Sequence, residues 1–226
     1  MDRRDRDEKF WDEKHSDDTY FPCGVDYGGE LRRHYDDEEA QLRLGLTPTG
    51  LDGRFLDLRK KGKAWSILDL GAGYGDFGAY LAPHVRTYVG VDISKVIVDK
   101  GNAAIREAGI KNMFMLQAQN GTLDCLRDRD FDLVFSTGVF IHIAQYQARA
   151  YLKELPRILK PDGRFVIHIN MGLGNNTLHD DRTVQLYSED GYEALFKDTG
   201  LKILETWDQA PFRAHCFARQ IYGKKA

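Results

Sequence analysis

Apolar and polar residues follow two different patterns along the chain, and the change falls near residue 65. From Trp65 onward, short apolar runs alternate with longer segments in which apolar residues recur every three or four positions. This alternation is typical of a parallel sheet whose strands are connected by helices. It predicts strands at 65–70, 87–91, 113–117, 131–136 and 164–170, and helices at 76–82, 95–108 and 145–159.

Capping and turn residues mark where several of these elements begin and end. Ser94 is the predicted N-cap of the helix over 95–108, because a serine oxygen accepts a free backbone N–H at a helix start. Pro156 lies inside the helix over 145–159 and predicts a local kink, since proline lacks a backbone N–H. The sequence KPDG at 160–163 then predicts a turn.

The C-terminal quarter of the chain predicts a loop, a helix and two further strands. The loop covers 171–186, and the helix covers 189–199 with Ser188 as its N-cap. Two extended runs follow at 201–207 and 212–222, separated by only four residues. So short a connection predicts an antiparallel hairpin at the edge of the sheet.

The first 59 residues have a different character. Charges of both signs fill residues 1–20, which is typical of a helix that lies on the surface, and further helices are predicted over 30–46 and 51–59. We therefore divide the chain into an N-terminal helical cap or lid at 1–59 and a second domain at 60–226. The aromatic residues of the first part either close over a ligand or cover the flank of the sheet, and both alternatives stay open.

Composition narrows the classes of function. The chain has 226 residues, of which 42% are hydrophobic, enough to bury a core. Its 32 basic and 35 acidic residues are well mixed, so we expect no nucleic-acid partner. No apolar run is long enough to cross a bilayer or to serve as a signal peptide, so we expect a cytoplasmic protein without a membrane partner. Three widely spaced cysteines predict neither a disulfide framework nor a zinc site.

The stretch ILDLGAGYGDFGAYL, residues 67–81, carries two overlapping glycine patterns. Gly73, Gly75 and Gly78 satisfy the G-x-G-x-x-G pattern of dinucleotide-binding proteins. That pattern places its first glycine directly at the strand end and an acid about 20 residues beyond the motif. Here Asp92 follows Gly78 by only 14 residues. The spacing therefore disfavours a nicotinamide cofactor.

The second pattern is D-x-G-x-G-x-G over 69–75, followed by Asp92 at the end of the second predicted strand, YVGVDIS. An ionised carboxylate in that place can accept hydrogen bonds from both hydroxyls of a ribose, and charged acceptors make such bonds stronger. Glycines lack a Cβ, so they let the backbone approach a ligand closely and adopt positive φ. We therefore predict that Asp92 holds a ribose and that the glycine turn contacts the rest of the ligand.

With these motifs, residues 60–222 resemble the class I S-adenosylmethionine-dependent methyltransferases. Further matches are FDLVFSTGVFIHI over 131–143 and LPRILKPDGRFVI over 155–167. The resemblance implies an α/β fold: a Rossmann-like seven-stranded sheet with helices on both faces, a terminal antiparallel hairpin and an N-terminal helical extension. It also implies that S-adenosyl-L-methionine is the cofactor and that its binding residues are Asp69, Gly71, Ala72, Gly73, Gly75, Asp92, Ile93, Gln119, Asn120 and Ser136.

The resemblance assigns parts of the cofactor to some of these residues. Ile93 would lie against the adenine, and residues 136–139, which begin with Ser136, would border the methionine end. Gln119 stands where the family often has an acid for the adenine amino group, and an amide oxygen can still accept from that group.

Methyl transfer from a sulfonium needs the acceptor lone pair aligned behind the methyl carbon, in a site that excludes water. A hydroxyl acceptor benefits from a general base, for which histidine is the usual choice. His142 and His168 are the candidate catalytic residues, each with a purely structural role as its alternative. No metal site is expected, because HDDR at 179–182 is interpreted as a solvated loop and residues 136–137 are Ser-Thr where metal-dependent relatives carry an acid.

The leading hypothesis is an enzyme that methylates a small-molecule acceptor on oxygen or nitrogen, for instance in secondary metabolism. The loop after the fourth predicted strand, STGV, lacks the motif of the nucleic-acid amino methyltransferases and the glutamate pair of the protein arginine methyltransferases. One alternative is a non-catalytic module that binds S-adenosylmethionine within a partner complex. A more remote one is an NAD-dependent oxidoreductase. The identity of the acceptor and the formation of a homodimer stay open.

Overall fold

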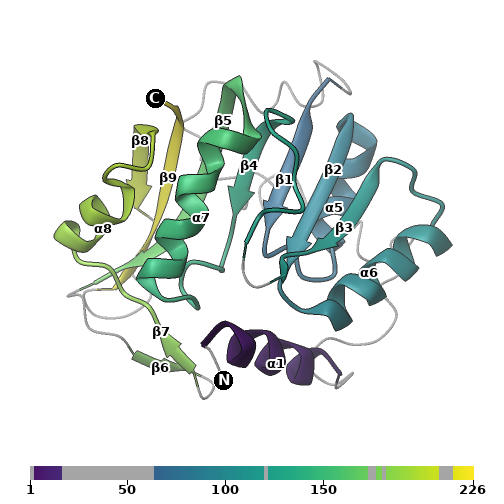
Figure 1. Cartoon of the computed structure of the whole chain (residues 1–226), viewed down its shortest axis with the longest axis horizontal. Helices are drawn as coiled ribbons and strands as arrows, with labels where there is room; N and C mark the ends of the chain where they lie inside the picture. The colour runs from purple at the N-terminus through teal and green to yellow at the C-terminus, as the bar shows by residue number, and fades with distance from the viewer. Residues whose placement is uncertain (1–2, 17–63, 120–121, 173–176, 180–181, 209–215) are drawn as a thin grey trace. The chain divides into compact units, whose positions relative to one another are not determined.

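A computed structural model of the chain describes residues 3–16, 64–119, 122–172, 177–179, 182–208 and 216–226 (Figure 1). The chain divides into two compact units, Met1–Leu126 and Arg127–Ala226. The helices predicted over 30–46 and 51–59, and the predicted boundary at residue 59, lie outside the described residues.

The first unit contains three parallel strands and the helices that follow them. Its elements are α1 (Arg3–Ser16), β1 (Ser66–Leu70), α5 (Asp76–Leu81), a 3-10 turn (Ala82–His84), β2 (Thr87–Asp92), α6 (Lys95–Glu107) and β3 (Met113–Gln117). β2 pairs in parallel with β1 on one side and with β3 on the other, so Leu70 lies opposite Val91, and Asp92 opposite Gln117. The carboxyl ends of all three strands therefore meet at one edge of the sheet.

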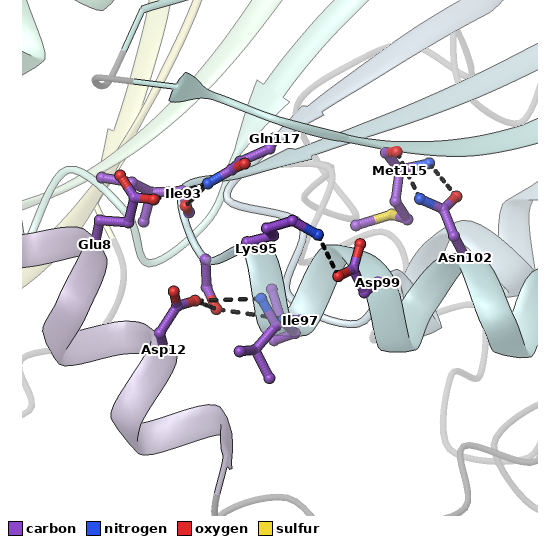
Figure 2. Close-up of polar contacts among 11 residues, drawn as sticks. Glu8, Asp12, Ile93, Lys95, Ile97, Asp99, Asn102, Met115 and Gln117 are labelled. Carbon is purple, nitrogen blue, oxygen red and sulfur yellow. Dashed lines mark hydrogen bonds and ion pairs between the residues drawn. The ribbon is translucent and has the colours of Figure 1, made fainter.

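Local sequence explains how these elements start and pack. Every residue of β1 is buried, as expected for a central strand with an apolar run. Ser94 caps α6 as predicted, its hydroxyl oxygen accepting the Ile97 N–H at 3.3 Å. At the free edge of β3, the Asn102 amide accepts the Met115 N–H and donates to the Met115 carbonyl, at 3.1 and 2.9 Å (Figure 2). This side chain from α6 thus satisfies an edge strand that has no further strand beside it.

The second unit contains four strands of the main sheet, two helices and a small separate ribbon. Its elements are β4 (Phe131–Ser136), α7 (Gln145–Ile158), β5 (Leu159–Met171), β6 (Thr177–His179), β7 (Arg182–Val184), α8 (Glu189–Phe196), β8 (Leu201–Asp208) and β9 (Phe217–Lys225). β4 and β5 are parallel, whereas β9 runs antiparallel to both β5 and β8. The Phe196 ring of α8 stacks on Phe165 of β5, at a centroid distance of 6.0 Å. This helix therefore covers one face of the strands.

The main sheet has seven strands in the order β3-β2-β1-β4-β5-β9-β8. The predicted Rossmann-like α/β fold, with seven strands and a terminal antiparallel hairpin, is confirmed. Within the described residues, none of the helices combines the length and apolar character needed to cross a membrane.

Several predicted boundaries of the second unit were wrong. The strands of the hairpin are β8, which reaches Asp208, and β9, which covers Phe217–Lys225, and the predicted four-residue connection lies largely outside the described residues. The predicted loop over 171–186 contains the antiparallel pair β6 and β7. The helix predicted to reach residue 199 ends at Phe196, since Asp198 adopts the left-handed conformation with φ 55°.

The KPDG sequence forms a bulge within β5 instead of a turn before it. Phe131 pairs with Leu159 and Leu133 with Arg164, so β5 carries extra residues between two closely spaced pairs. A Cβ on Gly163 would lie 2.9 Å from the Phe131 carbonyl oxygen, which explains why the bulge needs a glycine there. α7 continues through Pro156 for two further residues before β5 begins.

Candidate functional site

The glycine turn after β1 is held against the end of β2 by backbone hydrogen bonds. The N–H groups of Gly71 and Ala72 both donate to the Val91 carbonyl, at 2.7 and 3.1 Å. Gly71, Gly73 and Gly75 have φ values of 76°, 56° and 80°, as the sequence predicted for a turn that needs residues without a Cβ. The turn then leads directly into α5, with Gly75 at its N-cap position.

Asp92 joins this turn to the loop that follows β2. One carboxylate oxygen accepts the Gly73 N–H at 3.1 Å, and the other accepts the Ser94 N–H at 3.0 Å. An ionised carboxylate has about four lone-pair positions, so these bonds leave acceptor capacity on both oxygens. The side chain is therefore oriented by the protein and still able to accept hydrogen bonds from a ligand.

The Asp92 carboxyl has an unusual acidity. Its pKa is raised from 3.8 to about 6, chiefly by burial and to a smaller extent by the nearby carboxylate of Asp12, while the backbone N–H groups of Ser94, Gly73 and Ile93 act in the opposite direction. Desolvation of the charged form outweighs the hydrogen bonds that stabilise it. Ligand hydroxyls that donate to this group would therefore meet a poorly solvated charge, for which their hydrogen bonds are strong.

The glycines of the turn differ in what surrounds them. A Cβ on Gly75 would lie 2.5 Å from Met113 Cε, the mobile end of a side chain of β3, and the φ of 80° at this position favours glycine independently. A Cβ on Gly73 would have only Ile97 Cδ1 nearby among the described residues, at 3.9 Å. Among the described residues, the space that a Cβ on Gly73 would occupy is thus open enough for the backbone to be approached by a ligand.

The end of β3 supplies a polar side chain that the sequence reasoning missed. The Gln117 amide donates to the Ile93 carbonyl at 3.2 Å and to Glu8 at 2.9 Å (Figure 2). Gln119, the predicted adenine residue, has an exposed side chain, and Asn120 lies outside the described residues. Position 117, opposite Asp92 in the sheet, is the amide that the structure brings next to Ile93. The sequence did contain a signal for this residue, because Gln117 is the last residue of the strand predicted over 113–117.

Helix α1 reaches the same edge of the sheet with two carboxylates (Figure 2). Asp12 accepts the Ser94 hydroxyl at 2.6 Å and the Val96 N–H at 3.2 Å, both at the start of α6. Glu8, one turn earlier, accepts from Gln117. An acidic side chain is favourable here because the first N–H groups of a helix lack intrahelical partners. The charged N-terminal helix is therefore fixed beside Asp92, a contact that its sequence pattern did not indicate.

Asp69 lies in β1 and is engaged within the core. Its side chain is buried and accepts the hydroxyl of Tyr88, itself buried in β2, at 2.5 Å. This bond satisfies one oxygen of the carboxylate without any ligand. A role of Asp69 in cofactor binding stays a prediction.

In the second unit, the remaining predicted residues lie at the carboxyl ends of β4 and β5. Ser136, the last residue of β4, is buried, and a loop over 137–143 follows it. His168 of β5 accepts the Gly138 N–H at Nδ1 with a distance of 3.1 Å. Burial lowers the pKa of the His168 imidazole to about 4, so this ring is neutral near pH 7.

His142 belongs to the same loop. Its backbone N–H donates to the Val139 carbonyl at 2.8 Å, which closes a turn, and its side chain is half-buried. The structure thus places His142 on the loop after β4, as predicted, and brings the loop and His168 together through Gly138. Of the HDDR sequence, Asp180 and Asp181 lie outside the described residues.

The fold, together with the glycine turn after β1 and Asp92 at the end of β2, defines a class of protein. A parallel sheet whose first strand ends in a glycine turn and whose second ends in an acid is a Rossmann-like α/β protein that binds a nucleoside-containing ligand at the carboxyl ends of its strands. Residues 67–163 match the family model described as a methyltransferase domain. Over these residues the chain is similar to S-adenosylmethionine-dependent methyltransferases, in agreement with the resemblance that its motifs carry.

Individual relatives agree with this assignment. An uncharacterized methyltransferase of Bacillus subtilis, YcgJ, is 32% identical over 103 residues, which are 45% of this chain and 39% of that protein. A probable chloroplastic tocopherol O-methyltransferase of Oryza sativa is 28% identical over 158 residues, 68% of this chain and 42% of that protein. The chain thus matches less than half the length of these two relatives.

A solved structure shows the same fold over nearly the whole chain. It is described as a putative sarcosine dimethylglycine methyltransferase from Galdieria sulphuraria. The two structures align with a TM-score of 0.68 and 18% identity, covering 96% of this chain and 98% of that one.

Proposed function

We propose that the chain is an S-adenosylmethionine-dependent methyltransferase whose acceptor is a small molecule. The observation that carries the proposal is the Asp92 carboxylate, held by the N–H groups of Gly73 and Ser94, beside the open space over Gly73. In this proposal Asp92 accepts both ribose hydroxyls, while the glycine turn from Gly71 to Gly75, with Ala72, lies along the amino-acid portion of the cofactor. Ile93 and Gln117 border the adenine.

The cofactor supplies a methyl group on a positively charged sulfur, which a lone pair on the acceptor attacks in line. The protein's tasks are accordingly to orient the two reactants and to exclude water. We assign the first task, on the cofactor side, to Asp92 and the glycine turn. We assign water exclusion at the adenine edge to α1, which Asp12 and Glu8 fix beside Asp92 and Gln117.

On the acceptor side we propose oxygen or nitrogen as the methylated atom. The relatives support both, since one is a probable tocopherol O-methyltransferase and another is a glycine/sarcosine/dimethylglycine N-methyltransferase. A hydroxyl acceptor must lose a proton during transfer, and His142 is the candidate base for that step. An amine acceptor only has to enter in its neutral form, so it needs no strong base.

Calorimetry with S-adenosylhomocysteine and with NAD⁺ tests the cofactor half of the proposal. We expect binding of S-adenosylhomocysteine and none of NAD⁺, and we expect Asp92→Ala to abolish the former. Unchanged affinity in this variant would overturn the assignment. Gly109→Ala is the matched control, because Gly109 closes α6 away from the turn.

A panel of acceptors tests the second half. The panel contains tocopherol precursors and other phenols, together with glycine, sarcosine and dimethylglycine, and methyl transfer is followed as S-adenosylhomocysteine released. Turnover of one of these classes supports a small-molecule enzyme. Tight cofactor binding without turnover on the panel would favour the non-catalytic module instead.

A further inference from the structure

We propose that His168 is a positioning residue: it holds the loop after β4 in place by accepting the Gly138 N–H at Nδ1, in the neutral form that carries its proton on Nε2. The proposal rests on the proposed function for its catalytic meaning, since the loop at 137–143 is the one expected to border the methyl group. The bond itself, at 3.1 Å, joins β5 to this loop within the second unit.

The hydrogen bond fixes the tautomer of the ring. A backbone N–H can only donate, so Nδ1 must offer its lone pair and carry no proton. In a neutral imidazole the proton then resides on Nε2. Both nitrogens are therefore committed: Nδ1 has no lone pair to spare, and Nε2 has none at all in the ring plane. A histidine in this state is unable to act as a general base.

The surroundings of His168 favour the neutral ring. Its partner across the antiparallel pairing is Gln220 of β9, and the next residues of β5 on the same face are Val166 and Asn170. None of these side chains is charged. Burial lowers the pKa of the ring to about 4, which favours the neutral imidazole near pH 7.

Gly138 needs such a partner because of its backbone conformation. Its φ of 78° belongs to the left-handed region, where the chain turns away from β4 and its N–H leaves the strand ladder. Among the described residues outside its chain neighbours, no atom would lie within 4 Å of a Cβ at this position. The hydrogen bond to Nδ1 of His168 connects the Gly138 backbone to β5 and so helps to hold this part of the loop.

The far end of the loop is fixed by other residues. The Gln185 N–H donates to the Ile141 carbonyl at 2.7 Å, and the Tyr187 hydroxyl donates to the Phe140 carbonyl at 3.4 Å. Tyr187 is itself tied to the end of β5, since its N–H donates to the Asn170 carbonyl. The loop is thus held at both ends, and removing His168 releases only the end that begins with Gly138.

Nitrogen-15 NMR of the histidine side chains tests the tautomer without any methyl transfer. We expect His168 to show a protonated Nε2 and an unprotonated Nδ1, with shifts that do not change between pH 5.5 and pH 8. A ring that titrates in this range, or that carries its proton on Nδ1, would overturn the proposal. Because the measurement needs no cofactor or acceptor, its result is independent of whether the chain proves to be a methyltransferase.

Two amide substitutions separate positioning from base catalysis. In His168→Asn the amide oxygen occupies nearly the place of Nδ1 and can accept from Gly138, whereas in His168→Gln the amide lies one atom further out, near the place of Nε2. We expect the Gly138 amide to keep its hydrogen-exchange protection in the first variant and to lose about tenfold in the second, the effect of one hydrogen bond.

Initial rates of methyl transfer should show the same order of the two variants. They are measured with S-adenosylmethionine and whichever compound of the panel the enzyme methylates. His168→Asn is expected to stay within about threefold of the natural protein and His168→Gln to fall by about tenfold or more, because a displaced loop misaligns the reactants. Equal losses in the two variants, or a greater loss with asparagine, would contradict a positioning role.

Discussion

Asp92 at the end of β2 accepts the backbone N–H of Gly73 at 3.1 Å, across the turn that follows β1. One side chain therefore connects two strand ends and also keeps lone pairs for a ligand. This arrangement affects the acidity of the group, since the carboxylate is half-buried and desolvation raises its pKa to about 6. The unfolded chain lacks this environment, so stability and ligand affinity both depend on pH through Asp92.

Asp92→Asn should change how stability depends on pH. Between pH 3.8 and about 6 the folded natural protein holds a proton on Asp92 that the unfolded chain has lost, so this group makes the protein less stable as pH rises through that window. The Asp92→Asn variant has no carboxyl at this position, so it lacks this decrease in stability. We expect its free energy of unfolding, relative to the natural protein, to increase by about 2 kcal/mol between pH 4 and pH 7.

Urea unfolding at several pH values measures this difference. Asp99→Asn is the matched control, because Asp99 is an exposed carboxylate of α6 that forms an ion pair with Lys95. Its stability should shift by no more than about 0.5 kcal/mol. If the free energies of unfolding of Asp92→Asn and the natural protein differed by the same amount at every pH, the Asp92 carboxyl would not titrate as described.

Affinity for S-adenosylhomocysteine should rise with pH. Ribose hydroxyls donate to the ionised carboxylate, so binding favours the form that predominates above the pKa of about 6. The dissociation constant is expected to be constant above pH 7 and to increase by up to about tenfold per pH unit below pH 6. Calorimetry between pH 5 and pH 7.5 measures it, and Asp92→Asn should abolish the dependence. A flat profile in the natural protein would rule out Asp92 as the ribose acceptor.

Gly73→Ala should separate ligand contact from backbone strain. Gly73 and Gly109 have φ values of 56° and 66°, and neither position would bring a Cβ into a close contact. Both alanine variants should therefore lose about 1 kcal/mol of stability from the left-handed conformation. Only Gly73→Ala should weaken S-adenosylhomocysteine binding, by about tenfold or more, since its methyl group would enter the space beside Asp92. Equal affinities in the two variants would mean that the ligand does not approach Gly73.

The strands and turns of the first unit could be predicted because local rules agree there. Short apolar runs located β1 to β3 within one residue at each end, and the glycines of the turn adopt the positive φ that their lack of a side chain permits. Asp92 was predictable for the same reason, as an acid directly after an apolar run. These features depend on residues that are neighbours in sequence.

The contacts of α1 could not be predicted in this way. Asp12 and Ser94 are 82 positions apart, and α1 is charged on all sides, so no apolar stripe indicates a face that packs. The choice between Gln117 and Gln119 likewise depends on where β3 ends and on which amide points to Ile93. The bulge in β5 arises because residues 160–163 pair irregularly with a separate strand, whereas their composition alone indicates a turn.

Asp12→Ala should loosen α1 and weaken the start of α6. The Asp12 carboxylate caps the start of α6 from another helix, by accepting the Ser94 hydroxyl and the Val96 N–H. The substitution removes this acceptor from both donors. We expect a loss of about 1 kcal/mol of stability, the usual effect of removing a cap, and faster exchange of the Val96 amide.

Glu13→Ala serves as the control for this change. Glu13 follows Asp12 in α1, and its exposed side chain forms a long ion pair with Lys9, at 3.6 Å. Its removal should alter stability by less than about 0.5 kcal/mol and leave the Val96 amide unchanged. If both variants behaved alike, the docking of α1 would not depend on the Asp12 carboxylate.

Tyr88→Phe tests whether Asp69 belongs to the core or to the cofactor site. The Tyr88 hydroxyl donates to Asp69 at 2.5 Å and both residues are buried, so the substitution leaves a buried carboxylate short of one donor. This should lower the free energy of unfolding by about 1–3 kcal/mol. Tyr146→Phe, at an exposed tyrosine, should change it little.

If Asp69 acts through the core, S-adenosylhomocysteine affinity should stay within about twofold in both variants, because the bond to Tyr88 does not involve the glycine turn. A much larger loss of affinity in Tyr88→Phe alone would instead indicate that Tyr88 orients Asp69 toward the cofactor, as the sequence pattern first predicted.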